Sequence, residues 1–196
     1  MRSLLILVAG AVIALGTTAG TTGNGAGRNL DLHRSHMTVY VYKQGLFAFA
    51  ADNHEIDAPI AAGVYDETKN AVDVTVDAAK MAVLDPKLPA DRRASVQANM
   101  TSPKVLDVDR FPTISFRSTA FALDGRGHGT VTGNLTLHGQ THSVVVDVSR
   151  VDGTHFEGSA MVRQTTFGIS PIRIAGGMVT VKDDVKVVFD VYLLGK

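Results

Sequence analysis

Apolar and polar residues alternate along most of the chain after residue 30. A repeat of two residues is typical of β-strands that have one dry face and one wet face. Sheets with this pattern are usually antiparallel. The expected inward rows are Met37, Val39 and Val41; Val72, Val74 and Val76; Ile114 and Phe116; Val131, Gly133, Leu135 and Leu137; Phe156, Gly158, Ala160 and Val162; and Val185, Val187, Phe189 and Val191.

Short turn-forming segments separate these alternating runs. They cover residues 66–70, 124–127, 138–140 and 152–154, and each is rich in Asp, Gly, Asn or Thr. Such segments between alternating runs indicate hairpins. The pattern therefore predicts an all-β fold, a single antiparallel up-and-down barrel of about eight strands that closes on itself and leaves no unpaired edge.

One segment departs from the alternation. Val96 and Met100 lie four residues apart with polar residues between them, and Asp91 precedes them as a candidate cap. This spacing predicts a short helical insertion over residues 89–106.

The first thirty residues follow other patterns. An uncharged apolar run of 12 residues, Leu4–Leu15, follows Arg2, and small residues continue to Ala19. The run is shorter than the ~20 residues that a membrane-spanning helix needs. We expect residues 1–19 to be a signal peptide, 20–29 a flexible tether and 30–196 the barrel domain, periplasmic or secreted, with no transmembrane anchor after cleavage.

Composition removes several functional classes. Lys plus Arg and Asp plus Glu both count 19, so no net charge attracts nucleic acid. The chain has no cysteine, which excludes disulfides, a thiolate nucleophile and Cys-ligated metal. A Gly-x-Ser-x-Gly motif and a phosphate-binding glycine loop are also absent.

Histidines are the remaining candidates for chemistry. The pairs His33/His36 and His138/His142 have ligand-like spacing, but without matching carboxylates they indicate turn histidines, and we expect no metal. His54 follows an aromatic segment and lies beside charged residues. It could be a hydrogen-bonded anchor, a ligand contact or a general acid–base group.

A barrel of this size either fills its interior with side chains or holds one small ligand. Small residues at expected inward positions favour a cavity: Ala51, Ala78, Gly133, Gly158 and Ala160. A filled core is the alternative.

Four separate motifs resemble those of a known family. They are Phe111-Pro112-Thr113-Ile114-Ser115-Phe116, the hairpin Val131–His142, Phe156-Glu157-Gly158 and Phe167-Gly168-Ile169. Their order closely resembles the YceI-like family over roughly residues 31–194. The segment Lys43–Ile56 departs from the family pattern, which indicates a divergent branch. The resemblance implies a lipocalin-like barrel that is periplasmic or secreted, holds a polyisoprenoid chain and has no catalytic residues.

Together with this resemblance, which implies the isoprenoid-type ligand, these observations predict an exported carrier or storage protein for an apolar lipid, with no cofactor and no nucleic-acid partner. A homodimer is left open. The alternatives are a non-catalytic envelope or stress-response module with a filled barrel and, with less support, an enzyme that uses His54. The expected ligand-binding residues are Phe47, Phe49, His54, Ile114, Phe116, Leu135, Phe156, Phe167 and Phe189.

Overall fold

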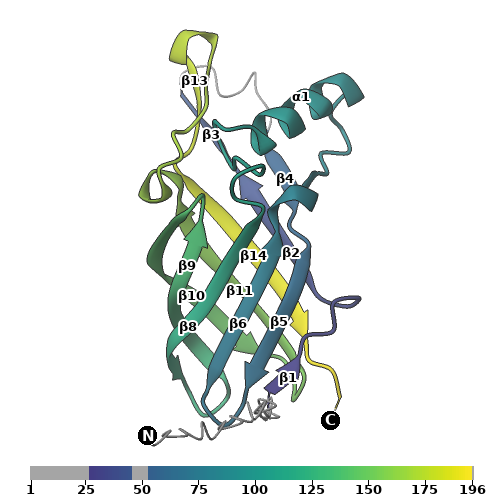
Figure 1. Ribbon diagram of the computed structural model, residues 1–196, viewed down its shortest axis with the longest axis vertical. Helices are drawn as coiled ribbons and strands as arrows, with labels where there is room; N and C mark the ends of the chain where they lie inside the picture. Colours follow the sequence, from purple (N-terminus) through teal and green to yellow (C-terminus); the bar gives the residue numbers. More distant parts are fainter. Residues whose placement is uncertain (1–26, 46–52, 196) are drawn as a thin grey trace, which may run out of the picture.

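The computed structural model describes residues 27–45 and 53–195. Its centre is a strongly curled antiparallel sheet, and one α-helix lies at one end (Figure 1). The strands are β1 (Gly27–Asn29), β2 (His36–Val41), β3 (Lys43–Gln44), β4 (His54–Asp57), β5 (Ile60–Asp66), β6 (Ala71–Asp77), β7 (Ala82–Val83), β8 (Thr113–Leu123), β9 (His128–Leu137), β10 (Gln140–Arg150), β11 (His155–Arg163), β12 (Arg173–Ile174), β13 (Val179–Val181) and β14 (Asp184–Tyr192).

The order of the main sheet confirms the up-and-down barrel, but the sheet has 11 strands rather than about eight, because the short segments β1, β4 and β7 also pair. The order is β1-β5-β6-β8-β9-β10-β11-β14-β2-β4-β7, so the last long strand, β14, lies beside β2. The segment from β4 to β5 is interrupted only by Ala58 and Pro59. The Ala58 N–H donates to Met37 O on the β2 side at 2.9 Å, and Pro59 O accepts from the Asp77 N–H on the β6 side at 3.1 Å. One bent segment thus joins both sides of the sheet.

This bent segment forms one seam of the barrel. A second seam, where residues 27–30 meet β5 and residues 193–194, lies near the termini. Residues 27–29, which the sequence assigned to the tether, form β1 and pair with β5. The Leu30 N–H donates to Gly63 O at 2.9 Å, and Asn29 O accepts from the Leu194 N–H at 2.8 Å. These ladder bonds order a segment that has no hydrophobic pattern of its own. The predicted signal peptide lies outside the described residues.

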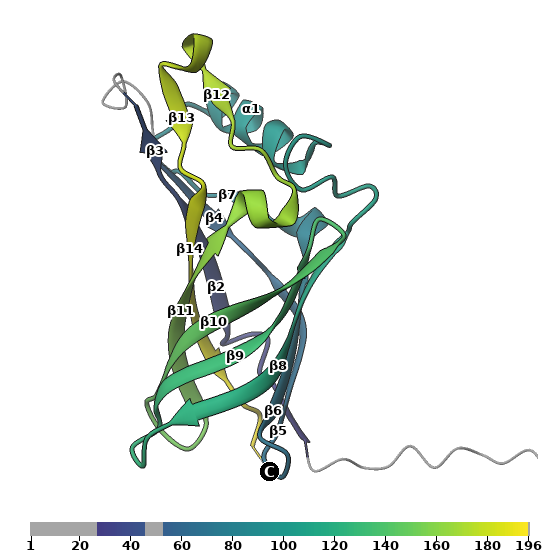
Figure 2. The ribbon, with the colours of Figure 1, turned by 90° about the vertical axis from the view of Figure 1, so that its left-hand side faces the viewer.

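The two ends of the barrel differ. At one end, here called the helix end, lie α1 (Ala90–Thr101) and a small sheet of order β12-β13-β3 (Figure 2). At the other, the terminal end, lie β1 and the C-terminus (Figure 1). The segment Phe167–Met178 includes β12 and lies at the helix end.

The helical insertion is confirmed but shorter than predicted. The helix ends at Thr101, and residues 102–106 form turns because Pro103 disfavours helical backbone in the residue before it. Pro89, not Asp91, is the cap residue, and no side chain caps the helix. Gln97 anchors α1 because its side chain accepts from the Val83 N–H and donates to Met81 O, both at 2.8 Å.

Aspartates fix several of the predicted turns. Asp66, Asp124 and Asp152 each accept a hydrogen bond from the backbone N–H two residues further on. Bonds from the Thr68 hydroxyl, and next from Lys69, lower the pKa of Asp66 from 3.8 to about 2. Because the folded state has the lower pKa, any stability from this ionised turn is present above pH 3.8 and is lost as the pH falls towards 2.

Candidate functional site

The barrel contains an apolar cavity of about 290 Å³ that is partly open to solvent. Alternation places one face of each long strand on its wall, which confirms the predicted inward rows. The wall is contributed by residues from both seams, all the long strands and the helical insertion: Leu30, Met37, Val39, Val41, Ile56, Ala58, Tyr65, Val72, Val74, Val76, Met81, Met100, Val105, Leu106, Ile114, Phe116, Phe121, Leu123, Val131, Leu135, Leu137, Val144, Val146, Val148, Arg150, Phe156, Ala160, Val162, Gln164, Ile169, Val185, Val187, Phe189, Val191 and Leu193.

Many of these apolar side chains are only partly buried although they face inward. Val74, Val146 and Val187 are examples from three different strands. Close-packed protein cores leave few voids larger than a water molecule. Partial burial of inward aliphatic side chains therefore means that the chain's own residues do not fill the barrel.

The inward glycines do not create this space, contrary to the expectation from the sequence. A Cβ at Gly133 would collide with the Phe116 ring, and a Cβ at Gly158 would collide with the Phe189 ring and with Asp147 O. Phe189 is the direct cross-strand partner of Gly158. Each phenyl ring thus covers a glycine on a neighbouring strand, and the free volume lies beyond the rings.

The cavity brings together five of the nine predicted ligand-binding residues, namely Ile114, Phe116, Leu135, Phe156 and Phe189. Phe167 is only 1% exposed and packs with Val162 and Val185 beside the cavity rather than on its wall. His54 also lies off the wall. Phe47 and Phe49 lie outside the described residues.

His54 takes part in a hydrogen-bonded anchor. Its Nδ1 lies 2.6 Å from Asp85 Oδ2, and Asp85 Oδ1 accepts from the Glu55 N–H at 2.8 Å. The Asp85 carboxylate is almost fully buried, and both its oxygens have a partner. Asp85 therefore fixes the segment after β7 against the start of β4, which is the structural role that the sequence left open for His54.

Different groups lie at the two ends of the cavity. At the helix end, Met100 and Leu106 of the helical insertion pack with Met81 and Ile56 in one buried cluster. At the terminal end, the Tyr65 ring lies 6.1 Å from that of Phe156 and 6.4 Å from that of Phe121. Rings at these separations pack favourably. Side chains of the fold itself thus narrow the apolar space at both ends, and the space remains partly open.

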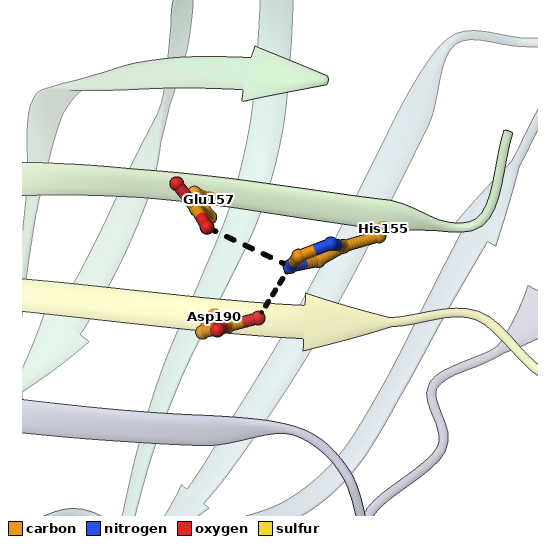
Figure 3. A group of neighbouring side chains, drawn as sticks. All are labelled: His155, Glu157 and Asp190. Atoms are coloured by element: carbon orange, nitrogen blue, oxygen red, sulfur yellow. Dashed lines mark hydrogen bonds and ion pairs between the residues drawn. The ribbon is translucent and has the colours of Figure 1, made fainter. Parts of the chain in front are cut away.

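A second polar cluster, of which the sequence carries no local sign, lies on the outside of the barrel. His155 Nε2 lies 2.6 Å from Asp190 Oδ1 and 3.9 Å from Glu157 Oε1 (Figure 3). The three ligand atoms lie within 4.8 Å of one another, as in groups that could hold a metal ion. Two zinc ligands with bonds of about 2.0–2.1 Å stand about 3.3 Å apart in a tetrahedron. The 2.6 Å separation is therefore that of a hydrogen bond, and the cluster forms a clasp.

The clasp has a structural purpose. Glu157 and Asp190 are direct cross-strand partners, an unfavourable pairing of like charges, and His155 Nε2 lies within 4 Å of both carboxylates. The His155 ring stacks on the Tyr192 ring with their centres 4.1 Å apart. The Arg34 guanidinium carbon lies 3.9 Å from the centre of the Tyr192 ring. These contacts hold the end of β14 against the segment between β1 and β2.

Replacing His155 with Ala is expected to lower the free energy of unfolding by about 1–2 kcal/mol. The variant loses the bond to Asp190 and the stacked ring, and it leaves the two carboxylates opposed. Urea unfolding monitored by circular dichroism measures the change. His33→Ala is the control, because the His33 side chain is exposed and only its backbone N–H has a bond. Equal stability of the two variants would contradict the clasp.

Within the described residues, none of the helices is long and apolar enough to span a membrane.

Comparison with solved structures finds the same fold. BcnA of Burkholderia cenocepacia superposes with a TM-score of 0.56 at 21% identity, covering 83% of this chain and 98% of that one. A polyisoprenoid binding domain from Saccharophagus degradans, implicated in plant cell wall breakdown, gives a TM-score of 0.59 at 11% identity, covering 87% and 99%. No curated protein matches the sequence.

A family model supplies the assignment. The YceI-like domain model matches residues 29–193, which span the two seams, the cavity wall and the helical insertion. The barrel order and the motifs at Phe111–Phe116, Val131–His142 and Phe167–Ile169 agree with this match. The chain belongs to the YceI-like family.

Proposed function

We propose that this protein is an exported carrier or storage protein that holds an apolar, isoprenoid-type lipid inside the barrel. The observation that carries the proposal is the cavity of about 290 Å³ inside the barrel, with an almost entirely apolar wall. Small-molecule sites are typically apolar and concave, with a few polar groups that fix orientation. The polyisoprenoid binding domain from Saccharophagus degradans has the same fold, which supports the choice of lipid.

The size of the cavity favours a short lipid. Ligand pockets usually measure about 300–1,000 Å³, so this one lies at the small end. Burial contributes about 0.8 kcal/mol for each CH₂, so three isoprene units supply roughly 12 kcal/mol before the cost of association, about 4–15 kcal/mol. Micromolar binding needs about 8 kcal/mol. Three or four isoprene units meet this requirement when the cost lies at the lower end.

The proposed location is the periplasm or the extracellular space. The support is the sequence pattern of residues 1–19. A carrier in an aqueous compartment would shield the lipid from water between membranes.

Two other functions have less support. A structural or stress-response module would need no internal space, whereas the inward side chains of this barrel leave a cavity unfilled. An enzyme that uses His54 would need that ring to face a substrate, whereas His54 is paired with the buried Asp85 and lies off the cavity wall.

Purified protein is expected to carry one lipid per barrel. Native mass spectrometry should show a bound mass, and solvent extraction followed by mass spectrometry should identify it. Protein stripped of lipid should bind retinol, a fluorescent polyene with an isoprenoid skeleton, with a stoichiometry of one. If no lipid is recovered and retinol does not bind, the carrier function is wrong.

A further inference from the structure

One charged side chain interrupts the apolar wall. Among the described residues that line the cavity, only Arg150 carries a formal charge. It is the last residue of β10 and continues the inward row of Val144, Val146 and Val148. It is also the direct cross-strand partner of Phe156, so it lies at the terminal end of the cavity.

Within the described part of the chain, Arg150 forms no ion pair. Five other arginines each pair with a carboxylate: Arg28, Arg110, Arg117, Arg126 and Arg163. The contacts of the Arg150 side chain are apolar instead. Its guanidinium carbon lies 5.4 Å from the centre of the Phe156 ring. The position thus offers a cation without an internal counter-charge beside an apolar space.

The neighbouring turn leaves room for this side chain. Gly127 has a φ of +83°, and a Cβ there would lie 2.7 Å from Arg150 Cβ and 3.5 Å from Nε. A glycine therefore allows the stem of Arg150 to lie close against the turn between β8 and β9. The Arg150 N–H also donates to Gly127 O at 3.0 Å, which holds the end of the strand in place.

The chemistry of this site selects a head group. A guanidinium binds carboxylates and phosphates through two parallel hydrogen bonds. The attraction is stronger beside low-dielectric walls than in water. The rest of the wall offers a tail only apolar contacts, apart from Tyr65 at the same end and Gln164 from the short helix after β11.

We infer that Arg150 binds an anionic head group, a carboxylate or a phosphate, of the lipid in the barrel. The head lies at the terminal end beside Phe156, and the tail extends towards Met100 and Leu106 at the helix end. This inference rests on the proposed carrier function and adds the class and the direction of the ligand. Arg150 is exposed, so water solvates its guanidinium when the lipid is neutral, and such a lipid gains nothing from the charge.

Three ligands that share one tail test the inference: farnesol, farnesoic acid and farnesyl phosphate. Each competes with retinol for lipid-free protein, at concentrations below micelle formation. The wild-type protein is expected to bind at least one of the anions about 10-fold more tightly than farnesol, a difference of about 1.4 kcal/mol. The better of the two anions identifies the head group as carboxylate or phosphate.

Substitutions locate the effect. Arg150→Gln is expected to reduce the ratio of the affinities for that anion and for farnesol to less than about 3-fold. Arg150→Lys should retain part of this ratio, because lysine keeps the charge but cannot donate two parallel hydrogen bonds. Arg126→Gln is the matched control, since Arg126 lies in the adjacent turn, pairs with Asp124 and does not line the cavity. It should keep the wild-type ratio.

The outcomes separate the two proposals. If all three ligands bind the wild-type protein equally, or if Arg150→Gln leaves the ratio unchanged, the assignment of Arg150 is wrong while the carrier function stands. If the wild-type protein binds neither retinol nor any of the three ligands, the carrier function itself fails.

Discussion

Replacing Ala160 with Trp is expected to abolish lipid binding while the barrel remains folded. Ala160 lies on β11, faces the cavity and is the direct cross-strand partner of Val187, another residue of the wall. An indole at this position occupies space that the lipid needs. Excluding about four CH₂ groups removes about 3 kcal/mol of binding energy, a loss of more than about 100-fold. Titration with retinol, followed by its fluorescence, measures this loss.

The neighbouring residue provides the control for this substitution. Ser159 precedes Ala160 on the same strand, and alternation turns its side chain to the outer face. Ser159→Trp adds the same ring to the same strand and is expected to leave retinol binding within about 2-fold, because no wall residue changes. Melting curves of both variants check the fold, since overpacking costs about 1–3 kcal/mol. If folded Ala160→Trp protein binds retinol as the wild type does, the lipid lies elsewhere.

The barrel could be predicted from the sequence because the alternation that indicates each long strand lies within that strand. Each long strand alternates within itself, and the inward rows follow from the period alone, as in Val185–Val191. The pairing of β1 could not be predicted in this way. Gly27–Asn29 has no apolar row, and it is ordered by ladder bonds to β5 and to the residues after β14. Such long-range pairing leaves no local signal.

Some features of the candidate site could likewise be predicted from local alternation, and others depend on long-range pairing. Phe116 and Phe189 were predicted on the wall because they belong to alternating rows, but the positions of their rings over Gly133 and Gly158 depend on the register between strands. The clasp depends on register too, since 35 residues separate His155 from Asp190. Arg150 is different. It continues the alternation of Val144 to Val148, so its inward direction was legible in the sequence.

Replacing Phe167 with Ala is expected to lower the free energy of unfolding by about 3–5 kcal/mol, the usual cost of removing a buried phenyl ring. The ring is only 1% exposed and packs with Val162 and Val185, and its centre lies 5.2 Å from that of the His142 ring, to which it is nearly perpendicular. For a domain of this size, each kcal/mol lowers the melting temperature by about 2–4 °C, so the expected fall is roughly 6–20 °C. Calorimetry and urea unfolding measure it.

Replacing a phenylalanine that lines the cavity is expected to weaken retinol binding more than stability. Comparing it with Phe167→Ala distinguishes a packing role from a ligand contact. Phe156 is partly buried and already faces the void, so Phe156→Ala enlarges an existing space rather than opening a new one. Its stability cost should therefore be smaller than that of Phe167→Ala, whereas its loss of retinol affinity should be larger. The reverse outcome, with Phe167→Ala stable but unable to bind, would place Phe167 against the lipid. Phe167 would then be a ligand contact, as the sequence predicted, and the cavity wall would extend to the short helix after β11.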